Sequence, residues 1–561
     1  MKNMLRKIRI VAAVLFFTLV TLLFLDFTGT LHAWFGWMAR VQLLPAVLAL
    51  NIGVVALLVV LTLLFGRIYC SVICPLGVMQ DVVSRAAGRR KKYRFKYSPA
   101  RTWLRYGVLA LFVALLAADI GWLAALIAPY SAYGRIVSNL LSPLYQGGNN
   151  LLAYAAEWAG SYAFYSVDVW MKSVGTLLVA VVTFAVLFIL AWRNGRTYCN
   201  TVCPVGTVLG VLSRYSLFKP RFDVSKCNGC KLCSRNCKAS CIDPTAHRID
   251  YSRCVACMDC LETCRRGAIG YTWRQKQATP AAAPQQTVSR PAAAPSAAAP
   301  STAAPLVATP STAALPVAVP TVVSMSGSIS VSANAQASAL APAPADAPVS
   351  AADPSRRRFL SVLGLFAFAV TVRAQEKKVD GGLALIEEKK IPDRATPLTP
   401  PGSLGARNMA AHCTACQLCV SVCPNQVLRP SGRLMTLMQP EMSYERGYCR
   451  PECTKCSEVC PAGAIRPITS AEKSATQIGH AVWIRENCVV GRDGVQCNNC
   501  SRHCPAGAIA MVDADPNDSA SLQIPVVNEE RCIGCGACEN LCPARPFSAI
   551  YVEGHVRHRT V

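Results

Sequence analysis

The 561-residue chain has no nucleotide-binding signature and no haem-attachment motif. Neither G-x-G-x-x-G nor a P-loop occurs, which argues against dinucleotide or nucleotide binding. C-x-x-C-H is also absent, so no c-type haem is attached. The chain therefore has no flavin or nucleotide entry point for electrons of its own.

Acidic residues are scarce, with 31 Asp and Glu against 57 Lys and Arg, a net charge of +26. The excess lies almost wholly in residues 1–374, whereas residues 375–561 are nearly balanced. A basic excess can indicate a nucleic-acid partner. Here the basic residues flank apolar runs, so we interpret them as membrane-orientation signals and expect no nucleic-acid partner.

Long apolar runs are abundant, and 52% of the residues are hydrophobic. We expect membrane-spanning helices at 10–25, at 43–65, from near Trp103 to just before Pro129, and at 174–192. No small-residue cleavage site follows the first run, so we interpret it as an uncleaved span. The positive-inside rule then places residues 1–9, 67–105 and 193–274 in the cytoplasm. The fold expected for residues 1–219 is a four-span, multi-pass helical bundle in a bacterial inner membrane.

This region contains an internal repeat, because residues 66–77 closely match residues 195–206. Each copy follows an outside-to-inside span and contains C-x3-C-P, so the two motifs should lie at the same depth. The cysteines of the two motifs are Cys70, Cys74, Cys199 and Cys203. We expect them to ligate a cluster jointly or to form a redox-active thiol pair near a quinone. The alternative is a structural role at helix ends.

An abrupt change of composition separates two further regions. Residues 275–354 are rich in Ala and Pro and predict a flexible linker. Residues 355–374 begin with Ser355 and the arginines that follow it, and they resemble a twin-arginine export signal. The alternative is a basic flank before a short membrane anchor, and the segment is either cleaved or retained as a fifth helix. The export machinery is then a partner, and residues 375–561 are periplasmic.

The 29 cysteines are the most informative feature, because most fall in runs of the form C-x2-C-x2-C-x3-C. Such a run supplies three thiolates to one [4Fe–4S] cluster and a fourth to the other cluster of an α+β bacterial-type two-cluster ferredoxin. In residues 220–274, a cytoplasmic ferredoxin domain, the crossover predicts one cluster on Cys227, Cys230, Cys233 and Cys264. It predicts the other on Cys254, Cys257, Cys260 and Cys237. Cys241 is surplus and is either structural or a replacement for Cys237.

Residues 375–561 contain four more runs. They are Cys413, Cys416, Cys419 and Cys423; Cys449, Cys453, Cys456 and Cys460; Cys488, Cys497, Cys500 and Cys504; and Cys532, Cys535, Cys538 and Cys542. The second and third runs have widened first gaps, which favours pairing run one with four and run two with three. Consecutive pairing is the alternative. The whole chain should hold six clusters or more.

Zinc and disulfides are the competing uses of so many cysteines. Structural zinc usually takes two separated C-x2-C pairs, and disulfides are common in an oxidising periplasm. The regularly spaced third cysteine argues against both uses, as does the Cys-Pro that ends every run of the last region. We therefore expect iron–sulfur clusters.

A quinol site, if present, must lie in the spans or at their rims. His32, Arg40 and Asp119 are the candidates, because ionisable groups at such positions are often functional. The alternatives are a wet loop beside interfacial tryptophans for His32 and Arg40, and a helix end for Asp119.

With these motifs in hand, residues 1–274 resemble the NapH-type and MauN-type membrane ferredoxins, in their four spans, C-x3-C-P pairs and two cytoplasmic runs. Residues 355–561 resemble the NapG-type and MauM-type exported ferredoxins. The chain resembles a fusion of the two. The resemblance implies a component of a quinol dehydrogenase that passes electrons from the membrane quinone pool to a periplasmic reductase or a small electron carrier. The fusion, Cys241 and the missing prolines after Cys237 and Cys264 depart from the pattern, which leaves the reductase open.

Two other functions compete with electron transfer from quinol. The chain could supply electrons for the maturation of a periplasmic metalloenzyme, or it could be a scaffold subunit whose clusters are structural. The same cysteine runs would serve all three, so the sequence does not separate them.

Overall fold

In this computed structural model the described residues are 2–88, 95–273, 379–380, 384–385, 387–518 and 521–560. Residues Met1–Gln275 and Ala369–Val561 belong to one compact unit, and Lys276–Phe368 belong to a second. The expected linker at 275–354 and the expected export signal at 355–374 lie outside the described residues. All that follows concerns the first unit.

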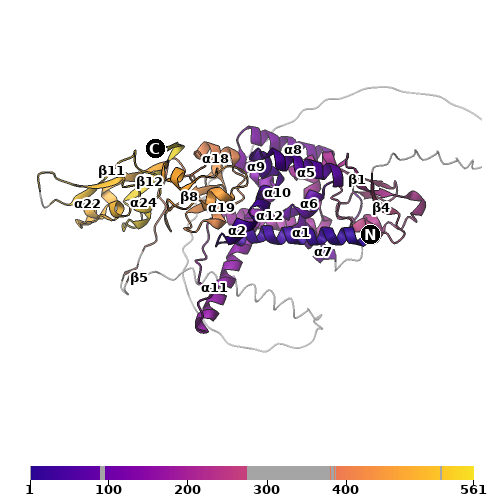
Figure 1. The fold of residues 1–561 in the computed structure, drawn as a ribbon, viewed down its shortest axis with the longest axis horizontal. Coiled ribbons are helices and arrows are strands. Elements are labelled where there is room, and N and C mark those ends of the chain that lie inside the picture. The colour runs from indigo at the N-terminus through magenta and orange to yellow at the C-terminus, as the bar shows by residue number, and fades with distance from the viewer. Residues whose placement is uncertain are drawn as a thin grey trace, which may run out of the picture. The chain divides into compact units, whose positions relative to one another are not determined.

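The described residues between 2 and 213 form helices joined by loops (Figure 1). The helices are α1 (Lys2–Leu25), α2 (Thr30–Phe35), α3 (Trp37–Arg40), α4 (Leu43–Leu48), α5 (Ile52–Phe65), α6 (Ile68–Val72), α7 (Pro75–Gly88), α8 (Thr102–Ala117), α9 (Gly121–Ile127), α10 (Pro129–Ile136), the π-helical turn η1 (Val137–Leu141), α11 (Ser142–Trp158), α12 (Val174–Asn194), α13 (Thr197–Thr201) and α14 (Pro204–Ser213). Figure 1 shows α1 running past α6 and α7, with which it packs.

Within the described residues, two helices are long and apolar enough to cross a membrane, Met4–Leu25 of α1 and the whole of α12. The expected span at 43–65 is divided into α4 and α5, and the third expected span is divided into α8 and α9. Only 28% of the α1 window and 22% of the α12 window are buried, so most of their apolar side chains face outward. These helices are compatible with membrane association, and the four-span bundle stays a prediction.

The two copies of the repeat fold in the same order. A long apolar helix, α5 or α12, ends at a glycine with positive φ, Gly66 or Gly195. A five-residue helix follows, α6 or α13, and then Cys74 or Cys203. The proline after each cysteine begins the next helix, where its missing N–H costs no hydrogen bond.

The helices of the two copies cross over. Helix α7 of the first copy packs against α12 of the second, and α14 of the second packs against α5 of the first. Each copy therefore completes its packing with the long helix of the other copy.

The cysteine-rich segments are built from short helices and two-stranded antiparallel sheets, as α+β ferredoxin domains require. In residues 218–273, β1 (Phe218–Phe222) pairs with β4 (Ile269–Trp273), and β2 (Ile242–Asp243) pairs with β3 (Arg248–Ile249). The helices there are η2 (Val224–Lys226), α15 (Leu232–Arg235) and α16 (Asp259–Thr263).

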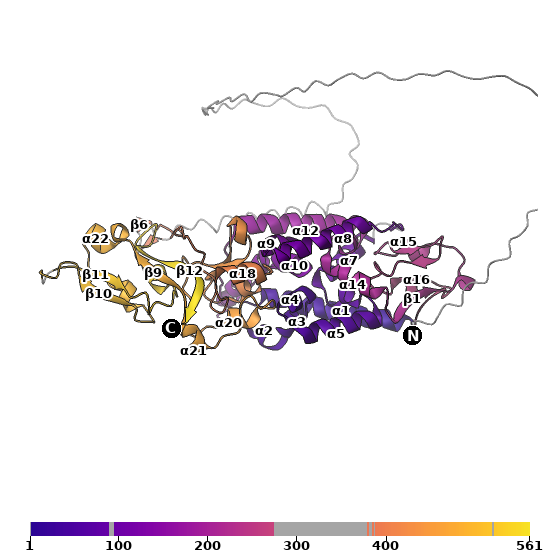
Figure 2. The same cartoon turned by 90° about the horizontal axis from the view of Figure 1, so that it is seen from above.

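The last segment repeats this plan around longer strands. The pairs are β5 (Val379–Asp380) with β6 (Ala384–Leu385), β7 (Leu428–Pro430) with β8 (Pro440–Met442), β9 (Thr476–Trp483) with β12 (Ile550–Thr560), and β10 (Ile509–Asp513) with β11 (Gln523–Val527). The helices are α18 (Ala406–His412), α19 (Leu418–Val422), η4 (Leu434–Thr436), α20 (Lys455–Val459), α21 (Ser470–Ser474), η5 (Arg485–Asn487), α22 (Val489–Asp493), α23 (Asn499–Arg502) and α24 (Ala537–Leu541). Figure 2 shows β9 beside β12.

Candidate iron–sulfur sites

The four regularly spaced cysteine runs share one backbone device. The second cysteine of each run lies between two residues with positive φ: Gly229 and Lys231, Ala256 and Met258, Ala415 and Gln417, and Gly534 and Gly536. The later residue of each pair precedes the short helix that carries the third cysteine. Consecutive N–H groups in such turns form an anion-binding concavity. The loop thus suits a negatively charged cluster.

In residues 220–274 the structure brings together both of the cysteine sets that the crossover predicts. One cavity is lined by Cys227, Cys230, Cys233 and Cys264. A second is lined by Cys237, Cys254, Cys257 and Cys260, with Cys241 beside them. Apolar side chains that include Ile242, Ile249 and Leu261 complete the wall of the second cavity.

Cys241 is a fully enclosed fifth thiol in that second cavity. Its Sγ lies 3.6 Å from the Sγ of Cys237, and its side chain also interacts with Cys254. Both readings of this residue, a structural thiol and a replacement for Cys237, agree with its position.

In the last segment the predicted pairing of run one with four and run two with three is wrong. One cavity is lined by Cys413, Cys416, Cys419 and Cys460, which belong to runs one and two. Another is lined by Cys488, Cys497, Cys500 and Cys542, which belong to runs three and four. The remaining cysteines follow the same consecutive order.

Those remaining cysteines form two sets of electrostatic neighbours. Cys456 interacts with Cys449, Cys453 and Cys423. Cys538 interacts with Cys532, Cys535 and Cys504. Runs one and two therefore form one two-cluster module, and runs three and four form another.

The geometry of these cavities differs from that of a zinc site. Among the described residues, no three His, Cys, Asp or Glu side chains are placed to hold a single metal ion. Zinc draws its sulfur ligands to about 2.3 Å, whereas a cubane gives each thiolate its own iron. Four cysteines lining the wall of an apolar cavity fit a [4Fe–4S] cluster.

The C-x3-C-P cysteines of the two repeats also lie together. All four are at most 4% exposed. Cys203 interacts electrostatically with the other three, Cys70, Cys74 and Cys199. The structure thus brings the cysteines of the two motifs together, and their matched depth in a membrane stays a prediction.

Each copy sends an arginine into the motif of the other copy. Arg67 of the first copy donates to the carbonyl of Cys199 at 3.1 Å. Arg196 of the second copy donates to the carbonyl of Cys70 at 2.6 Å. A Cβ on Gly206 would clash with the first of these contacts, and a Cβ on Gly77 with the second. Both glycines are therefore required by close approach.

A half-buried carboxylate ties this motif to the neighbouring ferredoxin segment. Asp81 on α7 pairs with Arg9 at 2.6 Å, with Arg196 at 2.7 Å and with Lys238 at 3.0 Å. Burial alone would raise the pKa of Asp81, but Arg196, Lys238 and Arg9 hold it well below its usual range. Lys238 directly follows Cys237 in the sequence, and Cys237 lines the same cavity as Cys241.

Of the quinol-site candidates, Arg40 contacts the last segment, and His32 is held within the helical domain. The backbone carbonyl of Glu458 on α20 accepts a hydrogen bond from Arg40 at 2.6 Å. The imidazole Nδ1 of His32 lies 3.1 Å from Asp26, and its buried Nε2 has no partner among the described residues. Close to Asp26, the backbone carbonyl of Thr28 accepts a hydrogen bond from the side chain of Lys455 on α20.

Asp119 behaves differently from the other two candidates. It is exposed, has a positive φ, and separates α8 from α9. The structure therefore agrees with the alternative interpretation, in which Asp119 marks a helix end. Asp26, by contrast, was missed from the sequence, although an acidic residue that directly ends a long apolar run was a usable signal.

Comparison with known proteins agrees with these cavities. A family model described as a 4Fe-4S binding domain matches residues 47–94 and 176–225. A 4Fe-4S dicluster domain model matches residues 495–545. The methylamine utilization ferredoxin-type protein MauM of Methylobacillus flagellatus is 32% identical over 29% of this chain and 70% of its own length. MauM of Methylorubrum extorquens is 33% identical over 34% of this chain and 84% of its own length.

This chain belongs to the MauM family of ferredoxin-type proteins. The ferredoxin-type protein NapG of Haemophilus influenzae is also similar, with 28% identity over 34% of this chain and 69% of its own length. No solved structure matches the chain. The predicted relation to MauM-type and NapG-type ferredoxins is confirmed, and the export signal and the relation of residues 1–274 to the membrane partner stay predictions.

As a MauM-type ferredoxin, the chain is an iron–sulfur electron-transfer protein that binds [4Fe–4S] clusters. When bound, each such cluster accepts and passes on one electron. The cysteines that line the cavities would hold the clusters, and the apolar side chains around them would exclude water. The similarity to these ferredoxin-type proteins implies that the chain exchanges electrons with redox partners, and it does not identify them.

Proposed function

We propose that this protein takes electrons from membrane quinol and delivers them to a periplasmic reductase or a small electron carrier. Oxidation of one quinol to quinone releases two electrons and two protons. The clusters take the electrons one at a time, and the protons go to water at the membrane rim. In this proposal α1, the α4–α5 and α8–α9 segments and α12 cross the inner membrane, residues 220–274 are cytoplasmic, and residues 375–561 are exported.

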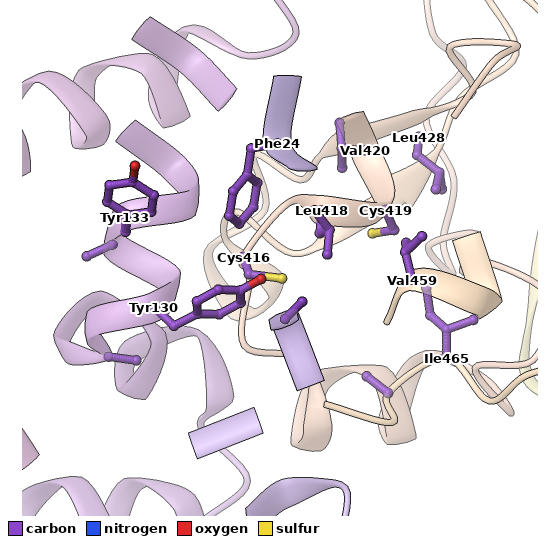
Figure 3. Close-up of a cluster of buried hydrophobic side chains, with 14 of the residues drawn as sticks. Phe24, Tyr130, Tyr133, Cys416, Leu418, Cys419, Val420, Leu428, Val459 and Ile465 are labelled. Atoms are coloured by element: carbon purple, nitrogen blue, oxygen red, sulfur yellow. The ribbon is translucent and has the colours of Figure 1, made fainter. Parts of the chain in front are cut away.

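The observation that carries the proposal is the contact between the helical domain and the loop of Cys416 (Figure 3). Tyr130 and Tyr133 of α10 and Phe24 of α1 lie beside this loop. The backbone of Gly134 approaches the carbonyl of Cys416 so closely that a Cβ would clash with it. The first cluster cavity of the last segment is therefore seated directly on apolar helices.

A hydrogen bond from η1, the turn that follows α10, stabilises the same contact between the helical domain and the Cys416 loop. Asn139 in the π-helical turn η1 donates to the side chain of Gln417 at 2.9 Å. Irregular helical turns of this kind often occur at functional sites. Because Gln417 directly follows Cys416, this bond orients the loop that lines the cavity.

A quinol site near this contact is supported by the surroundings of His32. Burial lowers the pKa of His32, although Asp26 raises it in part, so the imidazole is neutral near pH 7. A neutral Nε2 with no partner can accept a hydrogen bond from a quinol hydroxyl. Asp26 holds the ring through Nδ1, the arrangement expected of an oriented proton acceptor.

The test is quinol reduction of the intact, anaerobically purified protein in detergent. A menaquinol analogue is added while the cluster EPR signals are followed, with dithionite giving the fully reducible signal. We expect quinol to reduce the clusters of the wild-type protein, and His32→Gln to slow that reduction about 100-fold, the lower end of acid–base effects. Asp119→Asn, at an exposed helix end, is the matched control and should reduce at the wild-type rate.

Clusters that are present but stay oxidised under quinol would remove quinol as the donor. The maturation function or another donor would then be favoured. Equal rates for His32→Gln and Asp119→Asn would exclude His32 from the quinol site while leaving quinol as the donor.

A further inference from the structure

The pair of C-x3-C-P motifs has the ligand count of one cluster divided between two copies. Residues 47–94 contain Cys70 and Cys74 as their cysteines, and residues 176–225 contain Cys199 and Cys203. A [4Fe–4S] cluster needs four thiolates, so neither copy suffices alone. The structure buries all four thiols, and the bonds from Arg67 to the Cys199 carbonyl and from Arg196 to the Cys70 carbonyl hold the two copies together there.

The charge around these thiols is the second observation. Arg67 is fully buried, and it has no carboxylate partner within the described residues. Its guanidinium instead meets the side chain of Asn200 at 2.9 Å and the Sγ of Cys70 at 3.7 Å. A buried cation of this kind is costly unless a negative charge balances it.

Arg196 repeats the pattern from the second copy. Its Nη1 lies 3.9 Å from the Sγ of Cys199, and its carboxylate partner, Asp81, is shared with Arg9 and Lys238. Lys238 is also paired with Asp259 at 3.0 Å, so two carboxylates face these three cations, and the charge of Arg67 is added to them. Four thiolates around a cubane would carry the net negative charge that this buried cluster of cations lacks.

We propose that Cys70, Cys74, Cys199 and Cys203 hold a single [4Fe–4S] cluster shared by the two copies of the repeat, a seventh centre in the chain. Arg67 and Arg196 balance its charge from opposite copies. The use of this centre as a relay rests on the proposed function above, but its existence does not.

The contacts of the motif place this centre between the two ferredoxin segments. On one side Asn200, next to Cys199, donates to the carbonyl of Ala239 at 3.1 Å, and Ala239 lines the cavity of Cys237. The backbone N–H of Arg196 also donates to the carbonyl of Lys238 at 2.8 Å. The motif is therefore bonded directly to the loop after Cys237.

On the other side two buried tyrosines fill the path toward the last segment. Tyr69 interacts electrostatically with Cys70, Cys74 and Cys203. Tyr130 interacts in turn with Tyr69 and with Cys416 and Cys460, and its hydroxyl has no hydrogen-bond partner among the described residues. The shared centre thus joins cluster cavities that would otherwise be separated by apolar helices.

The experiment is an iron and sulfide count on the intact, anaerobically purified chain. Wild type should contain about 28 iron atoms per chain, four for each of seven clusters. Cys70→Ser, Cys199→Ser and the double variant should each contain about 24, because all three remove the same cluster. Ser71→Ala, a buried change in the same motif that keeps every thiol, should retain the wild-type count.

The double variant separates the alternatives. Loss of twice as much iron as in either single variant would overturn sharing, since it would mean one site in each copy. Unchanged iron in the single variants would overturn the cluster and leave a thiol pair. If a serine variant fails to fold, the wild-type count decides, because about 24 iron atoms would leave nothing for the motif cysteines.

These counts use no quinol, so they fail independently of the proposed function. A chain with seven clusters that quinol cannot reduce would retain the shared centre and lose the quinol donor. A chain with six clusters that quinol reduces would lose only the shared centre.

Discussion

At the scale of the residue, Cys241 makes the cavity around Cys237 unusual, because five thiols line it. We expect Cys241→Ser to retain all of the iron, since Cys237 remains in the position that the crossover requires. Cys237→Ser should lose about four iron atoms per chain. Iron analysis of the two purified variants measures both effects. The reverse result, with iron lost only in Cys241→Ser, would make Cys241 the ligand.

The cysteines that line the cavities could be predicted from the sequence, but the way in which the runs of the last segment combine could not. The spacing of the cysteines in a run describes how one loop wraps around a cluster. For the regular runs that begin at Cys227 and Cys532, this spacing was enough to predict the loop. The wide gaps before Cys453 and Cys497 suggested that runs two and three pair with each other, and the structure does not have this pairing. Those gaps change only the local loop, whereas pairing depends on which runs are folded into one module.

The widened second run shows what replaces the regular loop. Lys473 is buried and donates to the carbonyls of Arg450 and Cys453. These bonds hold a loop that lacks the positive-φ pair of the regular runs. A lysine about a dozen residues beyond the run carries no spacing signal, so this support could not be predicted.

At the scale of the element, strand β12 carries a half-buried histidine, His558, near its end. Burial lowers the pKa of His558 to about 4, with a smaller contribution from His555. Its Nε2 lies 3.0 Å from the hydroxyl of Thr399. The folded state therefore keeps this imidazole neutral at a pH where the unfolded chain takes up a proton.

The resulting pH dependence has a definite sign. Stability from His558 is fully present above pH 6.5, the ordinary pKa, and falls as the pH drops toward about 4. The loss is at most about 3 kcal/mol. His558→Gln should retain the bond to Thr399 and lose less stability between pH 7.5 and 5.0 in anaerobic urea unfolding. An equal loss in both proteins would contradict the assignment.

Helix breaks explain why the spans were only partly predictable. The apolar run at 43–65 is interrupted at Leu50, which has a positive φ, and Asn51 caps α5 through Val54. Asparagine is a common N-cap, so the break left a signal that average hydropathy conceals. Asp119 interrupts the third run in the same way.

At the scale of the whole molecule, the contact between the helical domain and the Cys416 loop should control electron flow. Gly134→Ala places a Cβ against the Cys416 carbonyl and the ring of Phe24, so the two surfaces must separate. We expect quinol-driven reduction of the last segment to slow, while dithionite still reduces the same clusters. Gly107→Ala is the matched control, because a Cβ there meets nothing within 4 Å.

Stopped-flow EPR or absorbance on the intact protein measures both rates. If Gly134→Ala matches Gly107→Ala under quinol, the electrons do not pass through this contact. The contact itself joins residues far apart in the sequence, which is why no motif predicted it.

The exchange of Arg67 and Arg196 between the two copies also has a consequence for biosynthesis. The first cysteine pair and its arginine leave the ribosome long before the second pair is made. Until α12 and α13 are in place, Cys70 and Cys74 have no opposite thiols, and Arg67 has no Cys199 carbonyl to bind. The proposed centre can therefore be loaded only after the second half of the repeat has been made and has folded against the first.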